Sequence, residues 1–271
     1  MMDITIGQFF PGKSVMHRTD PRVKICLTLF SIILLFVANN FVTLGLTVAF
    51  VFLGMLISRV PVKLYLKSIK AVIFIVVFTS LLNMFYGTGE PIARFWVFKI
   101  TVNGILNSVF ISSRIISLIL ASSVLTFTTS PTQLTDAIER LLKPLAVLRL
   151  PVHEFAMLMT IALRFVPLLL EETDKIMRAQ KARGADMESG GITQRIKAMI
   201  PVLIPLFVSA FRRAYDLATA MESRCYHGGE GRTKMKILKL TKVDLFVMAF
   251  SVLVLAAFIV FNHAFPPAFV V

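Results

Sequence analysis

Long uncharged runs separated by short charged segments dominate the pattern of the chain. The first run lies between Lys24 and Arg59, contains no charged residue, and has the polar pair Asn39 and Asn40 near its middle. A membrane-spanning helix needs about 20 apolar residues and has a lower limit of about 17. The run therefore predicts two short spanning helices joined by a tight turn at the asparagine pair.

Three further apolar runs have spanning length or come close to it. They cover residues 71–85, 105–129 and 245–261. Together with the first pair they predict an all-α polytopic membrane protein with about five transmembrane helices.

The segments around the third run carry weaker signals. Before it, Lys63, Lys67 and Lys70 recur on one helical face, which is typical of a helix in the membrane interface. After it, the turn-forming residues 86–91 lead into the stretch ARFWVFKITVNG, which has some strand character. Trp96 in that stretch suits a membrane–water boundary.

Two long amphipathic segments lie between the fourth and fifth runs. Ser130 and Pro131 favour a helix start, and residues 151–183 then predict one long helix that contains a proline. Arg164 divides its apolar part, which we therefore expect to be too short to span. After a glycine pair the same plan repeats, with prolines in an apolar run followed by a charged end.

These patterns predict three regions. Residues 1–130 form a lead-in and four spans, residues 131–242 a cytosolic or interfacial region with the two long helices, and residues 243–271 the last span. Of the 29 lysines and arginines, 14 lie between residues 171 and 242, and others flank the first two spans. The positive-inside rule then predicts a cytoplasmic amino terminus and cytoplasmic long helices. Five spans would leave the carboxyl terminus outside.

Composition supports the membrane and weakens other classes of protein. The chain is 56% hydrophobic and 16% charged, with a formal net charge of +14. The basic excess follows the ends of apolar runs and lacks interleaved aromatic residues, so we expect no nucleic acid partner. Two cysteines, Cys26 and Cys225, disfavour a disulfide framework or a four-cysteine zinc site. Charges in the first 24 positions disfavour a cleavable signal peptide.

Two stretches resemble enzyme motifs. GQFFPGKS, from Gly7 to Ser14, satisfies the phosphate-loop pattern G-x-x-x-x-G-K-[ST]. Such a loop needs a preceding buried strand and a following helix in a parallel sheet, whereas Pro21 follows almost at once. HEFAM, from His153 to Met157, begins like a zinc motif but lacks the second histidine. We expect a cytosolic lead-in at the first stretch, and no catalysis, metal or cofactor in this chain.

Two arginines interrupt apolar runs. A charge at bilayer depth costs about 2.5–3.5 kcal/mol on the insertion scale. Arg114 lies near the middle of the fourth run, and we favour a structural partner or snorkelling for it over a role in a transport pathway. We expect Arg164 to lie at the membrane interface.

The ends of the two long helices share a motif. AQKARG, from Ala179 to Gly184, aligns position by position with AMESRC, from Ala220 to Cys225. In each, an arginine follows a small residue, so that a partner's groove can approach the backbone closely. The always-charged, planar guanidinium suits carboxylates and carbonyls. Docking of a partner and a plain solvated basic helix end both fit this pattern.

Three stretches resemble the T component of energy-coupling factor transporters, of the shared type that serves several substrate-binding subunits. They are SVMHRTDPRVK, LRFVPLLLEETDKIMRAQKARGAD and PLFVSAFRRAYDLATAMESRCYHGGEGRTK. The resemblance implies a non-catalytic scaffold in a bacterial cell membrane. It would join two cytosolic ABC-type ATPases, which bind ATP and magnesium, to a membrane S component that captures a vitamin or another micronutrient.

The resemblance also implies which residues dock the ATPases. Each long helix would be a coupling helix whose Ala-Arg-Gly-like end enters the groove of one ATPase; the matching residues are Ala182, Arg183, Gly184, Ser223, Arg224 and Cys225. Cysteine in place of glycine puts the geometry of the second end in doubt, because it removes backbone freedom. The apolar sides of both helices would receive the S component, which also chooses the transported molecule.

Two alternatives remain open from the sequence. An independent carrier or channel would use Arg114 in its pathway, and a membrane enzyme would use the phosphate-loop-like stretch or HEFAM as its site.

Overall fold

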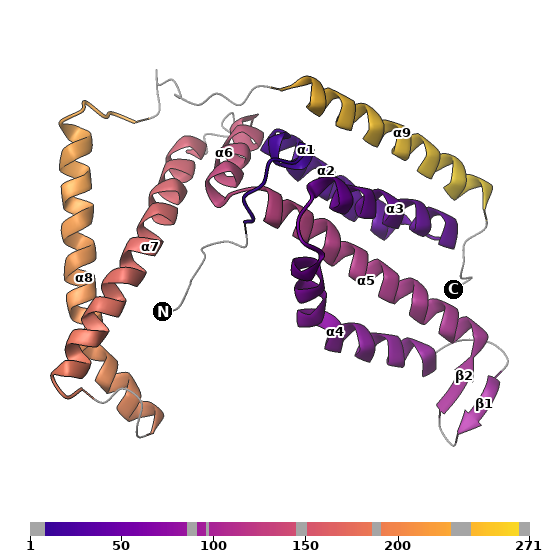
Figure 1. Ribbon diagram of the computed structural model, residues 1–271, viewed down its shortest axis with the longest axis horizontal. Helices are drawn as coiled ribbons and strands as arrows, with labels where there is room; N and C mark the ends of the chain where they lie inside the picture. Colours follow the sequence, from indigo (N-terminus) through magenta and orange to yellow (C-terminus); the bar gives the residue numbers. More distant parts are fainter. Residues whose placement is uncertain are drawn as a thin grey trace. The chain divides into compact units, whose positions relative to one another are not determined.

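Helices make up almost all of the regular structure. The computed structural model describes residues 9–85, 91–95, 98–144, 151–185, 191–228 and 240–265. Its elements are α1 (Val15–Arg18), α2 (Pro21–Val37), α3 (Phe41–Ser58), α4 (Val62–Phe85), β1 (Pro91–Phe95), β2 (Phe98–Thr101), α5 (Val102–Thr128), α6 (Pro131–Leu142), α7 (Val152–Ala182), α8 (Ile192–Glu222) and α9 (Lys242–Ala264) (Figure 1). The predicted all-α polytopic fold is confirmed.

A short hairpin is the one addition to the helices among these elements. Strands β1 and β2 pair antiparallel between α4 and α5, in the stretch whose sequence has some strand character. Trp96 lies outside the described residues.

Six helices in the described residues have the length and composition to cross a membrane: α3, α4, α5, α7, α8 and α9. This set differs from the five predicted spans because α2 is absent from it and α7 and α8 are added to it. Helix α2 has 17 residues and is shorter than the others. Helices α7 and α8 have 31 residues each and contain apolar stretches of spanning length beside their charged ends. By this measure our expectation that residues 151–183 are too short to span was wrong.

The elements fall into two compact units. The first comprises Met1–Ala137 and Ile237–Val271, and the second Ile138–Lys236. The first unit therefore contains α1 to α5, the hairpin and α9, and the second contains α7 and α8. Each unit is described by itself below.

The predicted turn at the asparagine pair is confirmed. Helix α2 ends at Val37 and α3 begins at Phe41. Asn40 caps α3, because its Oδ1 accepts a hydrogen bond of 2.8 Å from the backbone N–H of Thr43. The lysine-bearing segment before the third run is not a separate helix, since Lys63 and Lys70 lie within α4 together with that run.

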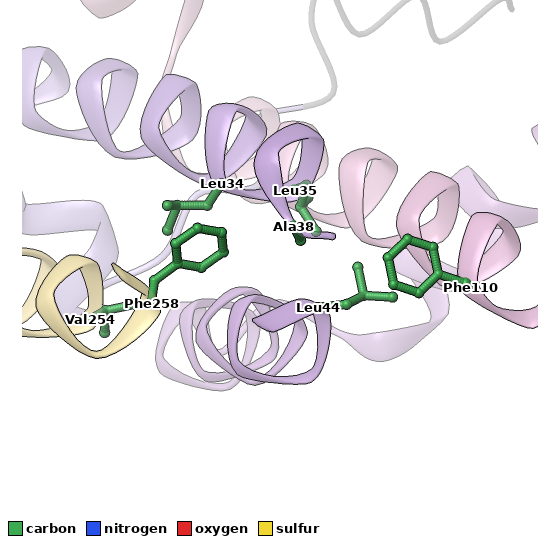
Figure 2. Packing of buried hydrophobic residues seen from close by; sticks show 7 residues of the cluster. All are labelled: Leu34, Leu35, Ala38, Leu44, Phe110, Val254 and Phe258. Atoms are coloured by element: carbon green, nitrogen blue, oxygen red, sulfur yellow. The ribbon is translucent and has the colours of Figure 1, made fainter. Parts of the chain in front are cut away.

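Helices from both ends of the chain meet in the core of the first unit. Leu34, Leu35 and Ala38 at the end of α2 pack with Leu44 of α3, Phe110 of α5, and Val254 and Phe258 of α9. Figure 2 shows these side chains converging from the four segments. The core therefore includes the last helix of the chain as well as the first ones.

Polar contacts at the start of α2 complete this packing. The backbone N–H of Asp20 donates to Asp244 Oδ1 at the start of α9, at 2.8 Å. Lys24 Nζ donates to the carbonyl oxygen of Thr128 at the end of α5, also at 2.8 Å. Lys24 is 3% exposed and Asp244 is 0% exposed. The stretch from Ser14 to Lys24 thus ties α2 to α5 and α9.

An apolar cavity of about 480 Å³ lies in the same unit. Its lining includes Leu27 of α2, Gly54 of α3, Ala121 of α5 and Phe246 of α9. The packing among these four helices is therefore incomplete on one side.

The second unit is built around the contact between α7 and α8. The two long helices cross each other (Figure 1). Each contains proline, at Pro167 in α7 and at Pro201 and Pro205 in α8. Most of their apolar side chains remain exposed in this structure, so the pair has little core of its own.

Candidate functional site

Helix α7 ends in a tight hydrogen-bonded turn that carries Arg183. The N–H of Gly184 donates to the carbonyl of Lys181, and the N–H of Ala185 donates to that of Gln180, both at 3.0 Å. Gly184 has a left-handed φ of +89°. These are the two bonds of a Schellman turn, in which glycine allows the left-handed residue.

Helix α8 ends in the same turn, at the equivalent position of the second repeated segment. The N–H of Cys225 donates to the carbonyl of Glu222 at 2.8 Å, and the N–H of Tyr226 donates to that of Met221 at 3.1 Å. Cys225 takes the left-handed position with a φ of 54°. The geometry that cysteine put in doubt is therefore retained, at the cost of about 1–2 kcal/mol for a left-handed non-glycine residue.

Both turns present their arginine to the outside. All six predicted docking residues are exposed: Ala182, Arg183, Gly184, Ser223, Arg224 and Cys225. Neither Arg183 nor Arg224 is paired with a carboxylate in the part of the chain that the structure describes. A backbone turn of defined shape thus holds an exposed cation at each helix end. What these ends bind stays a prediction.

Polar contacts between described residues join α7 to α8. Arg213 Nη2 lies 3.0 Å from Glu172 Oε2 in an ion pair, and Gln180 Nε2 donates to the carbonyl oxygen of Pro201 at 3.3 Å. The contact nearer the end of α7 is the one nearer the start of α8, so the two helices are antiparallel. Glu172 and Arg213 are 41 residues apart, the same separation as that of Arg183 and Arg224. The ion pair therefore joins equivalent positions of the two repeated segments.

Sequence reasoning missed these contacts between the helices. The alignment of the two repeated segments was available, and it places the acidic Glu172 on the basic Arg213, which is a signal for an ion pair. Nothing in the sequence pairs Gln180 with Pro201, because their contact depends on where the two helices cross.

The stretches that resemble enzyme motifs have structural contacts. Ser14 caps the four-residue helix α1, and His17 Nε2 lies 2.9 Å from the carbonyl oxygen of Phe10. Gly7 lies outside the described residues. His153 Nδ1 pairs with Glu139 Oε1 at 3.0 Å. The described residues contain no group of three or more histidine, cysteine or acidic side chains that could hold a metal ion.

Arg114 has structural partners. Its Nη2 donates to the carbonyl oxygen of Ala38, at the end of α2, and its guanidinium lies 4.8 Å from the centre of the Phe110 ring. The last carbonyls of a helix have no partner within it, so Arg114 supplies one of the missing donors. The favoured structural partner is confirmed. Arg164 is exposed, and its location at the membrane interface stays a prediction.

The fold defines a multi-pass membrane protein whose two long helices end in turns of matching geometry. The family model described as CbiQ, cobalt transport protein, matches residues 12–235. The chain is 49% identical over 263 residues to the energy-coupling factor transporter transmembrane protein EcfT of Ruminiclostridium cellulolyticum, covering 97% of this chain and 98% of that protein. It is 47% identical over 266 residues to the protein of the same name from Bacillus subtilis, covering 97% and 100%.

These matches extend over nearly the whole length of each protein. The chain therefore belongs to the CbiQ family, as a transmembrane T component of an energy-coupling factor transporter.

Proposed function

We propose that this chain is the scaffold that couples ATP hydrolysis by two cytosolic ATPases to the reorientation of an S component. The observation that carries the proposal is the pair of matching turns at the ends of α7 and α8, each with an exposed arginine. Two equivalent recognition elements on one chain suit two ATPases of the same fold. The chain itself binds no ATP or magnesium and has no catalytic residue.

The turns suit the grooves of such partners. The small side chains of Ala182 and Ser223 let a partner approach the backbone, and the arginine then reaches carboxylates or carbonyls inside the groove. Charge-assisted and bidentate contacts of this kind are about twice as strong as neutral hydrogen bonds. Arg183 and Arg224 are therefore the residues that dock the ATPases.

The charged halves of α7 and α8 lie on the cytoplasmic side in this proposal. Helix α7 carries Glu171, Glu172 and Asp174 beyond its apolar half, and each charge at bilayer depth would cost about 2.5–3.5 kcal/mol. The positive-inside rule also favours the cytoplasm for this basic region. The amino terminus lies on the same side.

The S component binds the apolar sides of the two long helices. Several large side chains there are 42–72% exposed, a degree that a membrane subunit would cover with a partner or lipid. They include Phe155, Leu158 and Met159 of α7 and Ile204, Phe207 and Phe211 of α8. The S component is the subunit that captures a vitamin or another micronutrient.

Purification of the assembled transporter tests the docking residues. The double variant R183E/R224E should insert into the membrane but release both ATPases, because two attractive contacts become repulsive. The matched control is R178E/R212E, which makes the same change of charge at exposed positions of the same helices. If R183E/R224E retains both ATPases through detergent purification as well as the control does, the docking assignment is wrong.

A further inference from the structure

Pro205 leaves one backbone carbonyl of α8 without its usual partner. In an α-helix the carbonyl of residue 201 accepts from the N–H of residue 205, and proline has no N–H. Pro205 lies inside α8, so the carbonyl oxygen of Pro201 lacks this donor from its own helix. A donor comes from α7 instead, where Gln180 Nε2 lies 3.3 Å from that oxygen.

Gln180 also belongs to the turn that carries Arg183. Its backbone carbonyl accepts the N–H of Ala185, which closes the turn. One residue therefore takes part in two contacts. Its main-chain carbonyl closes the docking turn, and its side chain donates to the α8 carbonyl that Pro205 leaves without a donor.

The ion pair between Glu172 and Arg213 forms the second polar contact across the same two helices. The Gln180 contact lies near the end of α7, and the Glu172 contact lies about two helical turns before it. Few side chains of the pair are buried, with Ala156 and Val202 as examples, so apolar packing gives weak control of the crossing. Polar contacts such as these therefore contribute to holding α7 and α8 at that point.

The corresponding position in the second turn has different chemistry. Met221 is the residue of α8 that aligns with Gln180, and its carbonyl accepts the N–H of Tyr226 in the same way. A thioether cannot donate a hydrogen bond. The turn of Arg183 is therefore joined to the other long helix through the side chain of Gln180, and the aligned residue in the turn of Arg224 cannot make an equivalent bond.

We propose that Gln180 is a positioning residue that joins the Arg183 docking turn to the proline break of α8, so that movement of one ATPase is delivered to both long helices. This inference rests on the proposed docking of an ATPase at Arg183. It predicts that Gln180 is dispensable for assembly and required for efficient coupling.

The test uses the complete transporter in liposomes and compares Q180L with Q194L. Leucine has the size of glutamine without a donor, and Gln194 is an exposed glutamine of α8. Q180L should retain both ATPases, while uptake per ATP hydrolysed falls roughly three- to ten-fold, as expected for one net hydrogen bond. Q194L should leave that ratio unchanged. Q180K, which restores a donor, should recover most of it.

A proline variant separates this role from a general structural one. P205A restores an N–H for the carbonyl of Pro201, so Q180L should have no further effect in a P205A chain. Hydrogen exchange over residues 179–185 provides a second measurement: it should be faster in Q180L than in Q194L, and this difference should disappear in a P205A chain.

The outcomes distinguish this inference from the proposed function. If R183E/R224E releases the ATPases while Q180L behaves like Q194L in uptake per ATP, docking stands and the role of Gln180 is wrong. An equal effect of Q180L with and without P205A, or loss of ATPases from Q180L, also overturns it. If R183E/R224E keeps its ATPases, the proposed docking is wrong, and the inference about Gln180 loses its basis with it.

Discussion

Cys225 shows how far one side chain can depart from a motif without changing the backbone. It has a φ of 54° where Gly184 has +89°, and the same pair of turn hydrogen bonds forms around each. The repeated motif located both arginines at the ends of the long helices. The motif left the second turn in doubt because cysteine has less backbone freedom than glycine. That argument does not include the hydrogen bonds donated by the N–H groups of Cys225 and Tyr226, which hold the left-handed residue in place.

Replacing Cys225 with glycine should therefore stabilise the second turn. Relief of the left-handed strain exceeds the extra entropy that glycine has in the unfolded chain, so we expect a gain of about 0.5–1 kcal/mol. G184A should act in the opposite direction at the equivalent position. Thermal unfolding of the purified protein and hydrogen exchange at the two helix ends measure both changes. Shifts of the same sign in C225G and G184A would contradict the strain argument.

The hydropathy pattern predicted where individual helices begin and end, but it did not predict how they contact one another. The asparagine pair located the turn between α2 and α3 because Asn40 is a good cap. Counting charges led us to underestimate the apolar length of α7, since Arg164 divides its apolar stretch but does not prevent the helix from reaching spanning length and composition. Tertiary contacts such as Glu172 with Arg213 are invisible to periodicity because they depend on how two helices cross.

The cavity beside α3 allows a test of helix packing. Gly54 lines it, and a Cβ there would meet only Met16 Cε at 3.6 Å, an ordinary contact. G54L should fill the space and raise stability by about 0.5–2 kcal/mol more than G45L does. Gly45 lies on the same helix with no neighbouring atom within 4 Å of an added Cβ, so both variants share the gain in helix propensity. Equal thermal shifts in detergent would show that the cavity is not filled.

The first unit as a whole is held by contacts between the beginning and the end of the chain. The N–H of Asp20 and the carboxylate of Asp244 are 224 residues apart in sequence. The stretch that resembled the family included Asp20 and Lys24, but no sequence pattern predicted that their partners are in α9 and at the end of α5. Distant contacts of this kind require the complete fold, whereas the type and approximate number of helices follow from local composition.

Removal of the Asp244 side chain should weaken the whole unit. Its carboxylate accepts from the N–H of Asp20 and from the N–H and hydroxyl of Thr241. D244A leaves the buried N–H of Asp20 without this acceptor and removes two contacts to the exposed Thr241, so we expect a loss of about 1–3 kcal/mol. D216A, at an exposed position of α8, should change stability by no more than about 0.5 kcal/mol. Thermal unfolding of the two variants compares them, and equal shifts would show that the contact at Asp244 contributes little.

The contact between Asp20 and Asp244 also sets an order of events during synthesis. Helix α2 leaves the ribosome long before α9 exists, so the buried N–H of Asp20 at its start has no Asp244 acceptor until late in translation. Until then the start of α2 lacks one of its partners, and the core around Leu34 lacks Phe258. A chain that stops before α9 cannot complete this packing, because it lacks both the Asp244 acceptor and the Phe258 ring.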